Sequence, residues 1–469
     1  MQRTTASEQV PCVGGERLKK AEDIRIEIPR NAQRVLGALE AAGFEAFVVG
    51  GCVRDALMGR VANDWDITTN ALPQQTHELC EAAGFAVFDT GIEHGTVTVH
   101  VDHEPFEVTT YRADGSYSDG RHPDSVTFLP SIDGDLARRD FTVNALAYSD
   151  STGLVDLYGG LEDLSARRLR SVGDPHKRFA EDGLRIIRGI RFSSVLGFSI
   201  EEQTARAIHE DRELLLPVAM ERISAEFLKL LCGDNVVRVL LEYRDVIATF
   251  LPQLAPEFDF DQRNPYHIYD VWEHSVRSCG VIEPDPTLRL AALIHDIGKP
   301  STFTVDEAGV GHFYGHADAG APIAEDVCRT LKLSNAMRKN VVALVEHHDR
   351  VLPMSPKSIR RLIARLGEDT CRQLYKVFAA DKLTHSGLSQ VENIQALKAS
   401  MELFEETLAG MSAFSERDLA IDGLDLIALG FEKGPILGEL KSEIFAKVID
   451  EELPNDREAL LAYARSKLG

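Results

Sequence analysis

The sequence predicts an α+β amino-terminal domain that is followed by mostly α-helical regions. Segments rich in β-branched and aromatic residues alternate with helix candidates up to about residue 155, and strand-like segments become rare beyond it. The 469 residues are enough for about three or four domains. With 44% hydrophobic and 27% charged residues, the composition is that of a globular chain, which excludes disordered and collagen-like classes.

The amino-terminal part contains a helix candidate and then a series of strands. Asn31 to Ala42 is expected to form a helix that Gly43 closes. Strands are expected at 44–51, 63–68, 86–91, 96–101 and 105–112, with a hairpin turn at 102–104. Residues 113–131 are rich in Gly, Ser, Asp and Pro and are expected to form a loop. From about residue 135 the chain is expected to turn helical.

Charge and cysteine content limit the partners and the compartment. The formal net charge is -23, so contact with a nucleic acid requires a local basic patch. Residues 137–192 offer a modest one, with ten basic and eight acidic side chains. No apolar run approaches the roughly 18 residues of a membrane span, and the first residues lack a signal-peptide pattern. The seven scattered cysteines lack CxxC spacing and indicate reduced thiols. We therefore expect a cytoplasmic protein without membrane contact.

A glycine pair ends the first predicted strand and opens a predicted helix in the segment GGCVRD (50–55). Backbone N–H groups of such a turn can approach a phosphate, and Gly51 lies at the start of the helix. The Arg54 guanidinium can add two hydrogen bonds to the same phosphate. An ordinary strand–turn–helix with two packing glycines has the same pattern, because short glycine motifs are weak signals.

Two aspartates follow on the next predicted strand, in the segment DWDIT (64–68). Asp64 and Asp66 are two residues apart, which places both carboxylates on one face of a strand. Such like charges repel unless cations bridge them, and the apolar neighbours Trp65 and Ile67 favour a partly buried position over a solvated edge. A carboxylate pair beside a phosphate-binding turn suits Mg²⁺-dependent phosphoryl or nucleotidyl transfer. Glu107 on a neighbouring strand is a candidate third acid.

Taken together, GGCVRD and DWDIT resemble the polymerase-beta-type nucleotidyltransferases. More narrowly, they resemble the family of class II tRNA nucleotidyltransferases and bacterial poly(A) polymerases. The family's order and spacing extend over about residues 44–231, because three further segments are similar to it: LARRDFTVNALAY (136–148), EDGLRIIRGIRF (181–192) and ERISAEFLKLL (221–231). The resemblance implies a polymerase-beta-like nucleotidyltransferase domain with a helical neck.

The resemblance also implies a role for each motif. Asp64 and Asp66 would hold two Mg²⁺ ions for transfer of a nucleotide from CTP or ATP to an RNA 3′-hydroxyl, with release of pyrophosphate. Glu107 would be a third ligand or a general base. The triphosphate would contact Gly51 and Arg54. The segment 136–148 would contact the phosphates and the ribose through three residues: Arg139, Asp140 and Asn144. A helix start capped by Asp140 is the alternative for that segment.

The segment 181–192 carries an Asp and three Arg at three-residue spacing on one predicted helix: Asp182, Arg185, Arg188 and Arg191. An aspartate accepts from an exocyclic amine, and an arginine donates to ring acceptors. Asp182 and Arg185 could therefore select cytosine or adenine, which both carry an amine. An i,i+3 salt-bridge ladder on a solvated helix face is the alternative.

The family comprises enzymes that add CCA to tRNA, enzymes that add only CC or only A, and poly(A) polymerases. The segment 94–112 resembles the tRNA-specific branch, and the loop 113–126 has full length. Both features favour addition of the complete CCA end to tRNA. Addition of only A or only CC, and poly(A) synthesis, remain open alternatives.

A second set of residues lies between 267 and 385. His274 belongs to a predicted helix, His295-Asp296 ends the apolar helix LRLAALI, and Asp381 follows in FAADKLTHS. This His…His-Asp…Asp pattern resembles the HD phosphohydrolase superfamily and implies a divalent metal of unassigned identity that hydrolyses phosphate esters. A second metal or a phosphate could be bound by three further residues: His316, His347 and His348. A degenerate module that only binds RNA is the alternative.

These motifs predict five regions. They are an amino-terminal extension (1–28), a nucleotidyltransferase domain (29–155), a helical neck with the base-selecting helix and an RNA-binding surface (156–255), an HD domain (256–390) and a helical carboxy-terminal region (391–469). The resemblance implies contact of the last region with the tRNA body. The sequence carries no indication of the oligomeric state.

Overall fold

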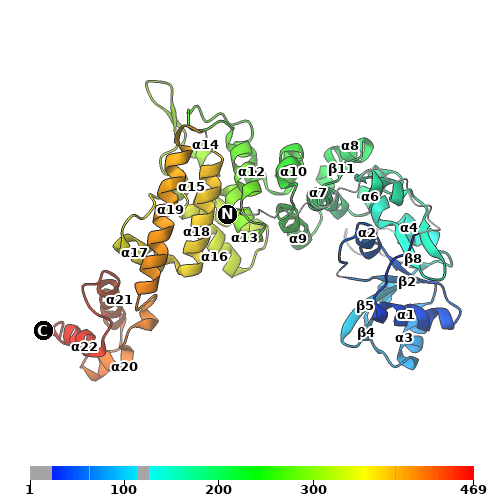
Figure 1. Cartoon of the computed structure of the whole chain (residues 1–469), viewed down its shortest axis with the longest axis horizontal. Helices are drawn as coiled ribbons and strands as arrows, with labels where there is room; N and C mark the ends of the chain where they lie inside the picture. The colour runs from blue at the N-terminus through cyan, green and yellow to red at the C-terminus, as the bar shows by residue number, and fades with distance from the viewer. Residues whose placement is uncertain (1–23, 63, 115–125, 386, 469) are drawn as a thin grey trace, which may run out of the picture. The chain divides into compact units, whose positions relative to one another are not determined.

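The computed structural model describes residues 24–62, 64–114, 126–385 and 387–468 (Figure 1). The chain separates into two compact units. The first extends to Ser193 and includes 197–218, and the second comprises 194–196 and the chain from Ala219 onward. None of the described helices has the length and apolar character to cross a membrane. Six cysteines fall within the described residues and none of these six is in a disulfide; Cys12 lies outside the described residues.

A seven-stranded mixed sheet forms the centre of the first unit, in the order β3-β4-β5-β2-β1-β8-β9. β1 (Ala46–Val49) and β2 (Ile67–Thr69) are antiparallel, whereas β2 and β5 (Glu104–Thr110) are parallel. The other four strands pair in antiparallel fashion: β3 (Ala86–Gly91), β4 (Thr96–Val101), β8 (Leu146–Ser149) and β9 (Gly153–Asp156). The strand order places β2, β5 and β1 side by side at the middle of the sheet.

β1 is buried on both faces. Ala46 and Val48 belong to the core that α1 (Arg30–Ala41) and α3 (Pro73–Ala82) cover. Phe47 and Val49 point to the opposite face and join a smaller cluster with Leu136. Burial on both sides explains why this strand is a continuous apolar run and does not alternate.

The predicted strands at 86–91 and 96–101 are confirmed to the residue. The helix predicted at 31–42 begins and ends one residue earlier. Asp102 and His103 form the predicted turn between β4 and β5, and both have positive φ angles, 51° and 69°. β2 is shorter than predicted, because it begins at Ile67 and the two aspartates precede it. Strands β8 and β9 were missed, since the chain was expected to be helical from about residue 135.

The segment 113–131 contains strand residues at both ends. β6 (Arg112–Asp114) pairs in antiparallel fashion with β7 (Val126–Phe128). The loop prediction is therefore wrong at both ends. At 126–128 the β-branched and aromatic side chains favour a strand. Residues 115–125 of the predicted loop lie outside the described residues.

The helical part of the first unit follows the sheet. It contains four helices: α5 (Gly160–Ser165), α6 (Pro175–Glu181), α7 (Leu184–Leu196) and α8 (Glu202–Glu210). The single helix expected over 181–192 is wrong at Asp182, which has extended backbone angles and separates α6 from α7. Its carboxylate accepts a hydrogen bond from the Leu184 N–H at 3.0 Å and so caps α7.

α13 (Pro286–Ile294) lies at the centre of the second unit, and every residue from Leu288 to Ile294 is buried. It packs against four helices: α9 (Met220–Leu231), α12 (Val271–Val281), α16 (Asn335–His347) and α18 (Glu368–Leu383). Apart from Arg289, these buried residues are all apolar, and a helix with apolar side chains on every side needs such complete cover. α15 (His316–Thr330) packs against α16.

The carboxy-terminal part is helical as well. α19 (Gly387–Gly410) packs against α17 (Pro356–Leu366) and α18. Residues 413–464 have their own apolar core, formed with α20 (Gly423–Ala428), α21 (Pro435–Ile449) and α22 (Arg457–Arg465). Arg361 of α17 pairs with Asp450 just after α21 at 2.7 Å. A sheet-containing first part and a helical remainder confirm the predicted fold class.

Candidate functional site

Three carboxylates gather at the start of β2 and on β5. Ile67 pairs with Val108 on the parallel strand β5, so Asp66 and Glu107, each one residue earlier, lie side by side. The Val49 N–H donates to the Asp66 carbonyl at 3.0 Å, which extends the pairing with β1 to this residue. Asp64 precedes Asp66 by two residues. Both are exposed rather than partly buried as predicted.

The electrostatics of this group favour a cation. Desolvation raises the pKa of Asp66 and the Glu107 carboxylate raises it further, whereas the Arg139 guanidinium lowers it and Asp64 has a smaller raising effect. Like charges in one place make the ionised forms costly, and a divalent ion relieves that cost. The three residues offer only oxygen ligands, which suit Mg²⁺.

The glycine turn between β1 and α2 (Gly51–Leu57) lies against Arg139. Gly50 has φ = 85°, and a Cβ atom there would lie 2.7 Å from the Arg139 Nη1 atom. The absence of a side chain therefore lets the guanidinium cross the turn. Arg139 is held by the buried Asp135, whose carboxylate accepts from its Nη2 atom at 3.4 Å. The turn, Arg139 and the Asp66 carboxylate thus form one site.

A chain of buried hydrogen bonds runs from α2 to α7. Arg54 Nη1 donates to Asn144 Oδ1 at 2.6 Å, and Asn144 Nδ2 donates to Asp140 Oδ1 at 3.0 Å. Asp140 Oδ2 accepts from Nε and Nη2 of Arg188 at 2.8 and 2.6 Å. Burial alone would raise the pKa of Asp140, but Arg188 and Asn144 hold it well below its usual range. The carboxylate is therefore ionised and fixed at neutral pH.

The Phe192 ring on α7 gathers three guanidinium groups. The Cζ atoms of Arg54, Arg188 and Arg191 lie 5.1, 5.4 and 3.6 Å from the ring centre. Such contacts are cation–π interactions and help to hold like charges close together. Sequence reasoning missed Phe192, although it directly follows Arg191 in the motif.

Arg185 is only 8% exposed and bonds within the protein. Its Nη1 atom donates to Glu181 Oε2 at 2.6 Å and to the Arg178 carbonyl at 2.9 Å, and Nη2 donates to the Arg138 carbonyl at 2.8 Å. Arg185 therefore ties α7 to α6 and to the segment that carries Arg139. The i,i+4 spacing of Glu181 and Arg185 was an available signal for one of these partners, whereas the sequence pattern gave none for the two carbonyl groups.

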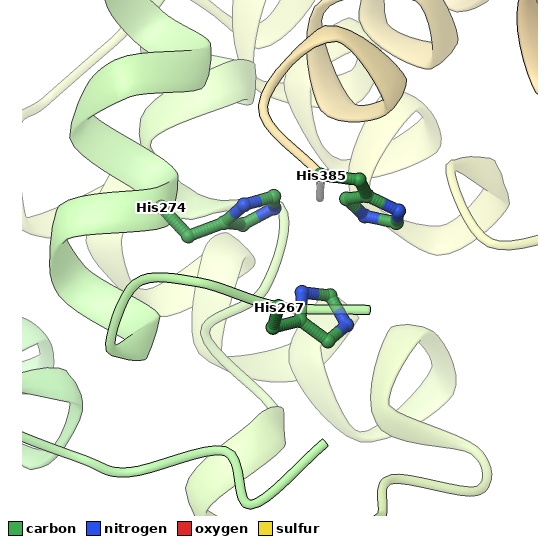
Figure 2. A group of neighbouring side chains, drawn as sticks. All are labelled: His267, His274 and His385. Atoms are coloured by element: carbon green, nitrogen blue, oxygen red, sulfur yellow. The ribbon is translucent and has the colours of Figure 1, made fainter. Parts of the chain in front are cut away.

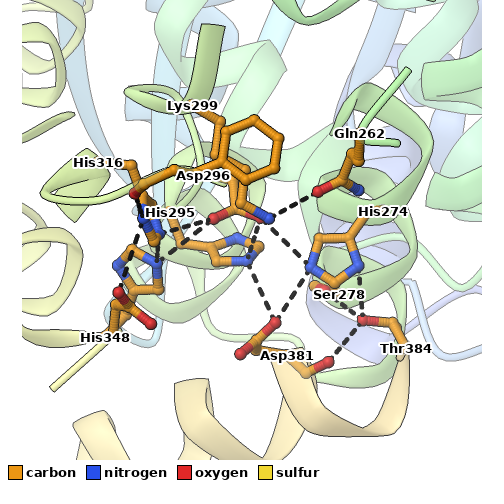
Figure 3. A network of polar contacts seen from close by, with 12 residues as sticks. Gln262, His274, Ser278, His295, Asp296, Lys299, His316, His348, Asp381 and Thr384 are labelled. Atoms are coloured by element: carbon orange, nitrogen blue, oxygen red, sulfur yellow. Dashed lines mark hydrogen bonds and ion pairs between the residues drawn. The ribbon is translucent and has the colours of Figure 1, made fainter. Parts of the chain in front are cut away.

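The second unit contains a cluster of imidazole and carboxylate groups. Among the described residues there are three overlapping groups whose ligand atoms lie within 4.8 Å of one another. One comprises His267, His274 and His385 (Figure 2). The other two are His274, His295 and Asp296, and Asp296, His316 and His348; Figure 3 shows the network of contacts that joins them.

The group of His274, His295 and Asp296 lies next to Asp381, and we call these four residues the HD position. It combines two imidazoles and two carboxylates. Asp296 Oδ2 lies 3.4 Å from His274 Nε2 and 3.3 Å from His295 Nε2. Asp381 Oδ1 lies 3.1 and 3.7 Å from the same two nitrogens. Ligands about 2.0–2.2 Å from one ion are about 3.0–3.5 Å apart, so these four residues fit a divalent metal.

The Asp296 carboxylate also faces a second pair of histidines. Its Oδ1 atom lies 3.2 Å from His316 Nε2 and 3.4 Å from His348 Nε2. Gly298 makes this approach possible, because a Cβ atom there would collide with the His316 carbonyl oxygen and lie 2.6 Å from the Gly320 nitrogen. One oxygen of Asp296 therefore faces His274 and His295, and the other faces His316 and His348.

Burial and close ion pairs shift the pKa values of the side chains in this cluster. Asp296 and Asp381 would be neutralised by burial alone, but neighbouring cations and imidazoles keep the pKa of both well below the usual range. Desolvation would lower the pKa of His295, yet Asp296 and Asp381 raise it to about 10. For His274 desolvation prevails and lowers the pKa to about 4. The cluster therefore holds both charged and neutral imidazoles.

Several residues of the cluster were missed from sequence. Lys299 Nζ lies 2.7 Å from Asp296 Oδ2 and donates to Gln262 Oε1 at 2.8 Å. The i,i+3 spacing from Asp296 was an available signal for Lys299, as was the i,i+4 spacing from Asp381 for His385. His347 is buried but belongs to none of the three groups.

A mixed sheet with three carboxylates beside a glycine turn and an arginine defines the head of a nucleotidyltransferase. Three family models match the chain: Poly A polymerase head domain at 46–170, RNA and SrmB-binding site of polymerase A at 197–258, and tRNA nucleotidyltransferase domain 2 at 316–464. The CCA-adding enzyme of Lactobacillus helveticus is 35% identical over 92% of this chain and 96% of its own length. That of Enterococcus faecalis is 34% identical over 93% and 96%. The chain belongs to the CCA-adding enzyme family.

Solved structures agree with this assignment. The Bacillus stearothermophilus CCA-adding enzyme in complex with CTP is 28% identical, with a TM-score of 0.71 over 94% of this chain and 97% of that one. The Thermotoga maritima CCA-adding enzyme complexed with tRNA is 20% identical, with a TM-score of 0.51 over 93% and 94%, and shows the shared fold alone.

Proposed function

We propose that this protein adds the sequence CCA to the 3′ end of tRNA, using CTP and ATP and releasing pyrophosphate. The group of Asp64, Asp66 and Glu107 beside the glycine turn is the observation that carries the proposal. The name of the Lactobacillus helveticus relative and the CTP in the Bacillus stearothermophilus structure support it. A cytoplasmic location accords with the free cysteines.

The residues of the first unit have distinct parts in this reaction. Asp64 and Asp66 would hold Mg²⁺, which activates the attacking hydroxyl and stabilises the leaving pyrophosphate. Glu107 is the third ligand or a general base. Arg139, which crosses the glycine turn, would pair with phosphate oxygens that approach Gly51. Thus the cation site and the triphosphate site adjoin.

Residues of the hydrogen-bonded chain would position the nucleotide. Asn144 orients Arg54 toward the triphosphate, and Asp140 orients Arg188. We assign recognition of the ribose 2′-hydroxyl to the Asp140–Asn144 segment, as the family resemblance implies. Asp140 is thus both a positioning residue and a candidate ribose contact.

Selection of the base is assigned to the start of α7. Asp182 would accept from the amine of cytosine or adenine. Arg185, whose Nη1 and Nη2 atoms already donate to Glu181 and to the Arg178 and Arg138 carbonyls, would donate to the ring acceptors through its remaining N–H groups. Arg188 and Arg191 flank the site through their contacts with Phe192. Guanine and uracil lack the amine at the corresponding edge and would be rejected.

One assay separates this function from its alternatives. The full-length protein is incubated with tRNA that lacks its CCA end, with CTP and ATP separately and together, and the products are sequenced. We expect CC with CTP alone and CCA with both. A poly(A) polymerase would give A runs with ATP alone. An enzyme that adds only CC would stop after CC even with both nucleotides present. An enzyme that adds only A would act only on a tRNA that already ends in CC.

We further propose that the second unit hydrolyses phosphate esters, such as terminal or 2′,3′-cyclic phosphates on RNA ends. The two-sided Asp296 carboxylate is the observation that favours it. A divalent metal bound by the HD position, and a second one bound by Asp296 with His316 and His348, would supply an activated water. Lys299 adds a cation for the phosphate. His347 remains a candidate supporting residue.

The test of this second activity uses two variants of the full-length protein. Asp296→Asn should abolish hydrolysis of a 2′,3′-cyclic phosphate and retain CCA addition, whereas Asp66→Asn should do the reverse. If the unaltered protein hydrolyses no phosphate ester with any of Mg²⁺, Mn²⁺, Co²⁺, Ni²⁺ or Zn²⁺, the proposed hydrolase activity of the second unit is wrong.

The functional regions are proposed as predicted: extension 1–28, nucleotidyltransferase domain 29–155, neck 156–255, HD domain 256–390 and tail 391–469. The division between the two compact units, at Val218, falls within the proposed neck.

A further inference from the structure

His267 and His385 lie beside the HD position but are not part of its ligand set. His267 precedes α12, and His385 follows α18. Their ring centres are 4.6 Å apart, and each lies 5.4 Å from the ring centre of His274. Figure 2 shows the three imidazoles converging from these separate segments. Residues so distant in the chain meet here because α12 packs against α18.

One carboxylate oxygen completes this group. Asp381 Oδ1 lies 3.0 Å from His385 Nε2 and 3.1 Å from His274 Nε2. The three imidazoles offer ligand atoms within 4.8 Å of one another. Separations of about 3.0–3.5 Å are those of ligands around a single ion, so the two measured distances fit a common metal.

A polar atom in this group lacks a partner. The His267 Nδ1 atom is buried and accepts or donates no hydrogen bond among the described residues. A buried nitrogen without a hydrogen-bond partner carries an uncompensated desolvation cost, which a bound metal ion would relieve.

We propose that His267, His274, His385 and Asp381 form a third metal-binding position, which takes a borderline transition ion such as Zn²⁺, Co²⁺ or Ni²⁺. Three imidazoles and one carboxylate form a more nitrogen-rich set than the HD position, and imidazole suits these ions. The site rests on geometry and is independent of whether the second unit hydrolyses phosphate esters.

The third position and the HD position share ligands. His274 Nε2 and Asp381 Oδ1 lie within ligand distance of both sets. A nitrogen lone pair binds one ion at a time, so an ion at the third position takes His274 from the HD position. A metal ion can therefore occupy the HD position or the third position, but the two cannot be filled at the same time.

The test removes the Asp296 carboxylate, which belongs to the HD position and to the group with His316 and His348. The third position does not include Asp296 and stays intact. Zn²⁺ binding to the full-length Asp296→Asn variant is measured by calorimetry and by metal analysis after dialysis. One Zn²⁺ per chain should remain. In the triple variant Asp296→Asn/His267→Gln/His385→Gln, its affinity should fall at least tenfold. Absence of bound Zn²⁺ in the first variant, or equal affinity in the second, would overturn the proposal.

A measurement on the unaltered protein is independent of how these variants fold. Diethyl pyrocarbonate modification of individual histidines is followed by peptide mass spectrometry with and without saturating Zn²⁺. His267 and His385 should react about tenfold more slowly with Zn²⁺, while the reaction of His77 on α3, in the first unit, should be unchanged. Protection of His274 and His295 without protection of His267 and His385 would assign the ion to the HD position alone and overturn the proposal.

Discussion

Asp140 accepts two hydrogen bonds from Arg188 through a single carboxylate oxygen, at 2.6 and 2.8 Å. The carboxylate is 8% exposed and the guanidinium is 32% exposed. This pair joins the segment that is assigned to the ribose and the phosphates with the helix that is assigned to the base.

This pair should stabilise the first unit in a pH-dependent manner. The folded pKa of Asp140 is depressed, so its contribution is present above the unfolded pKa of about 3.9 and is lost as pH falls toward the lower folded pKa. Asp140→Asn should cost about 1.5–3 kcal/mol at pH 7. The difference from the parent protein should shrink below about pH 4, as measured by urea unfolding. A double-mutant cycle with Arg188→Gln that shows no coupling at pH 7 would contradict this expectation.

Removal of one carboxylate beside β2 should stop nucleotide transfer without harming the fold. Asp66→Asn or Asp64→Asn removes a metal ligand worth several kcal/mol in the transition state, so kcat should fall by about 10³-fold or more. The folded pKa of Asp66 is raised, so its ionisation opposes folding as pH rises. Asp66→Asn should therefore melt at the same or a higher temperature at pH 8. Glu104→Gln, an exposed acid on the same strand as Glu107, is the control and should change neither quantity.

Gly50 in the glycine turn and Gly43 after α1 offer a matched pair of substitutions. Gly50 and Gly43 both have φ = 85°, and alanine at either costs at least about 1 kcal/mol of backbone strain. Only at Gly50 would the added Cβ displace Arg139, since nothing lies within 4 Å of it at Gly43. Gly50→Ala should raise the KM for CTP and ATP about tenfold or more, whereas Gly43→Ala should leave it unchanged. Equal KM values in steady-state assays would remove Arg139 from the triphosphate site.

Base selection can be tested with two capping aspartates. Asp182→Asn keeps a capping oxygen for the Leu184 N–H, since Asn is also a good cap, but adds a donor where the base amine approaches. The preference for CTP and ATP over UTP and GTP should shrink roughly 5- to 150-fold, as a bidentate base contact is worth about 1–3 kcal/mol. Asp174→Asn alters the equivalent cap of α6 and is the control. Unchanged discrimination in single-nucleotide addition would leave Asp182 with a structural role only.

Metal binding to the HD position should release protons. The pKa of His295 is raised to about 10, so the imidazole is protonated at pH 7 and must lose its proton to bind a metal. In the variant His267→Gln/His385→Gln, which retains the HD position but lacks the third position, the apparent Zn²⁺ affinity should rise about tenfold per pH unit between pH 6 and 8. Calorimetry in buffers of different ionisation enthalpy should detect about one proton per ion from His295. His312→Gln, on a separate hairpin, should not alter this number, and a pH-independent affinity would contradict the assignment.

Strong local signals predicted much of the fold. The strands 86–91 and 96–101 and the turn at Asp102–His103 are set by alternation and turn residues over short distances. β8 was missed because it pairs with β1, which lies about a hundred residues earlier, and β9 was missed because it pairs in turn with β8. The helix break at Asp182 was missed because a regular i,i+3 charge pattern does not reveal a capping bond.

The sequence by itself determined the motifs: the glycine pair, the Asp64–Asp66 spacing and the His…His-Asp…Asp pattern, since each is a fixed order of residue types. Tertiary structure alone decided which of them act together. Parallel pairing of β2 and β5 brings Glu107 beside Asp66, and packing of α12 against α18 brings His267 and His385 to His274. The physical reason is that carboxylates and imidazoles cooperate only at distances of a few ångströms, which chain packing sets and residue order does not.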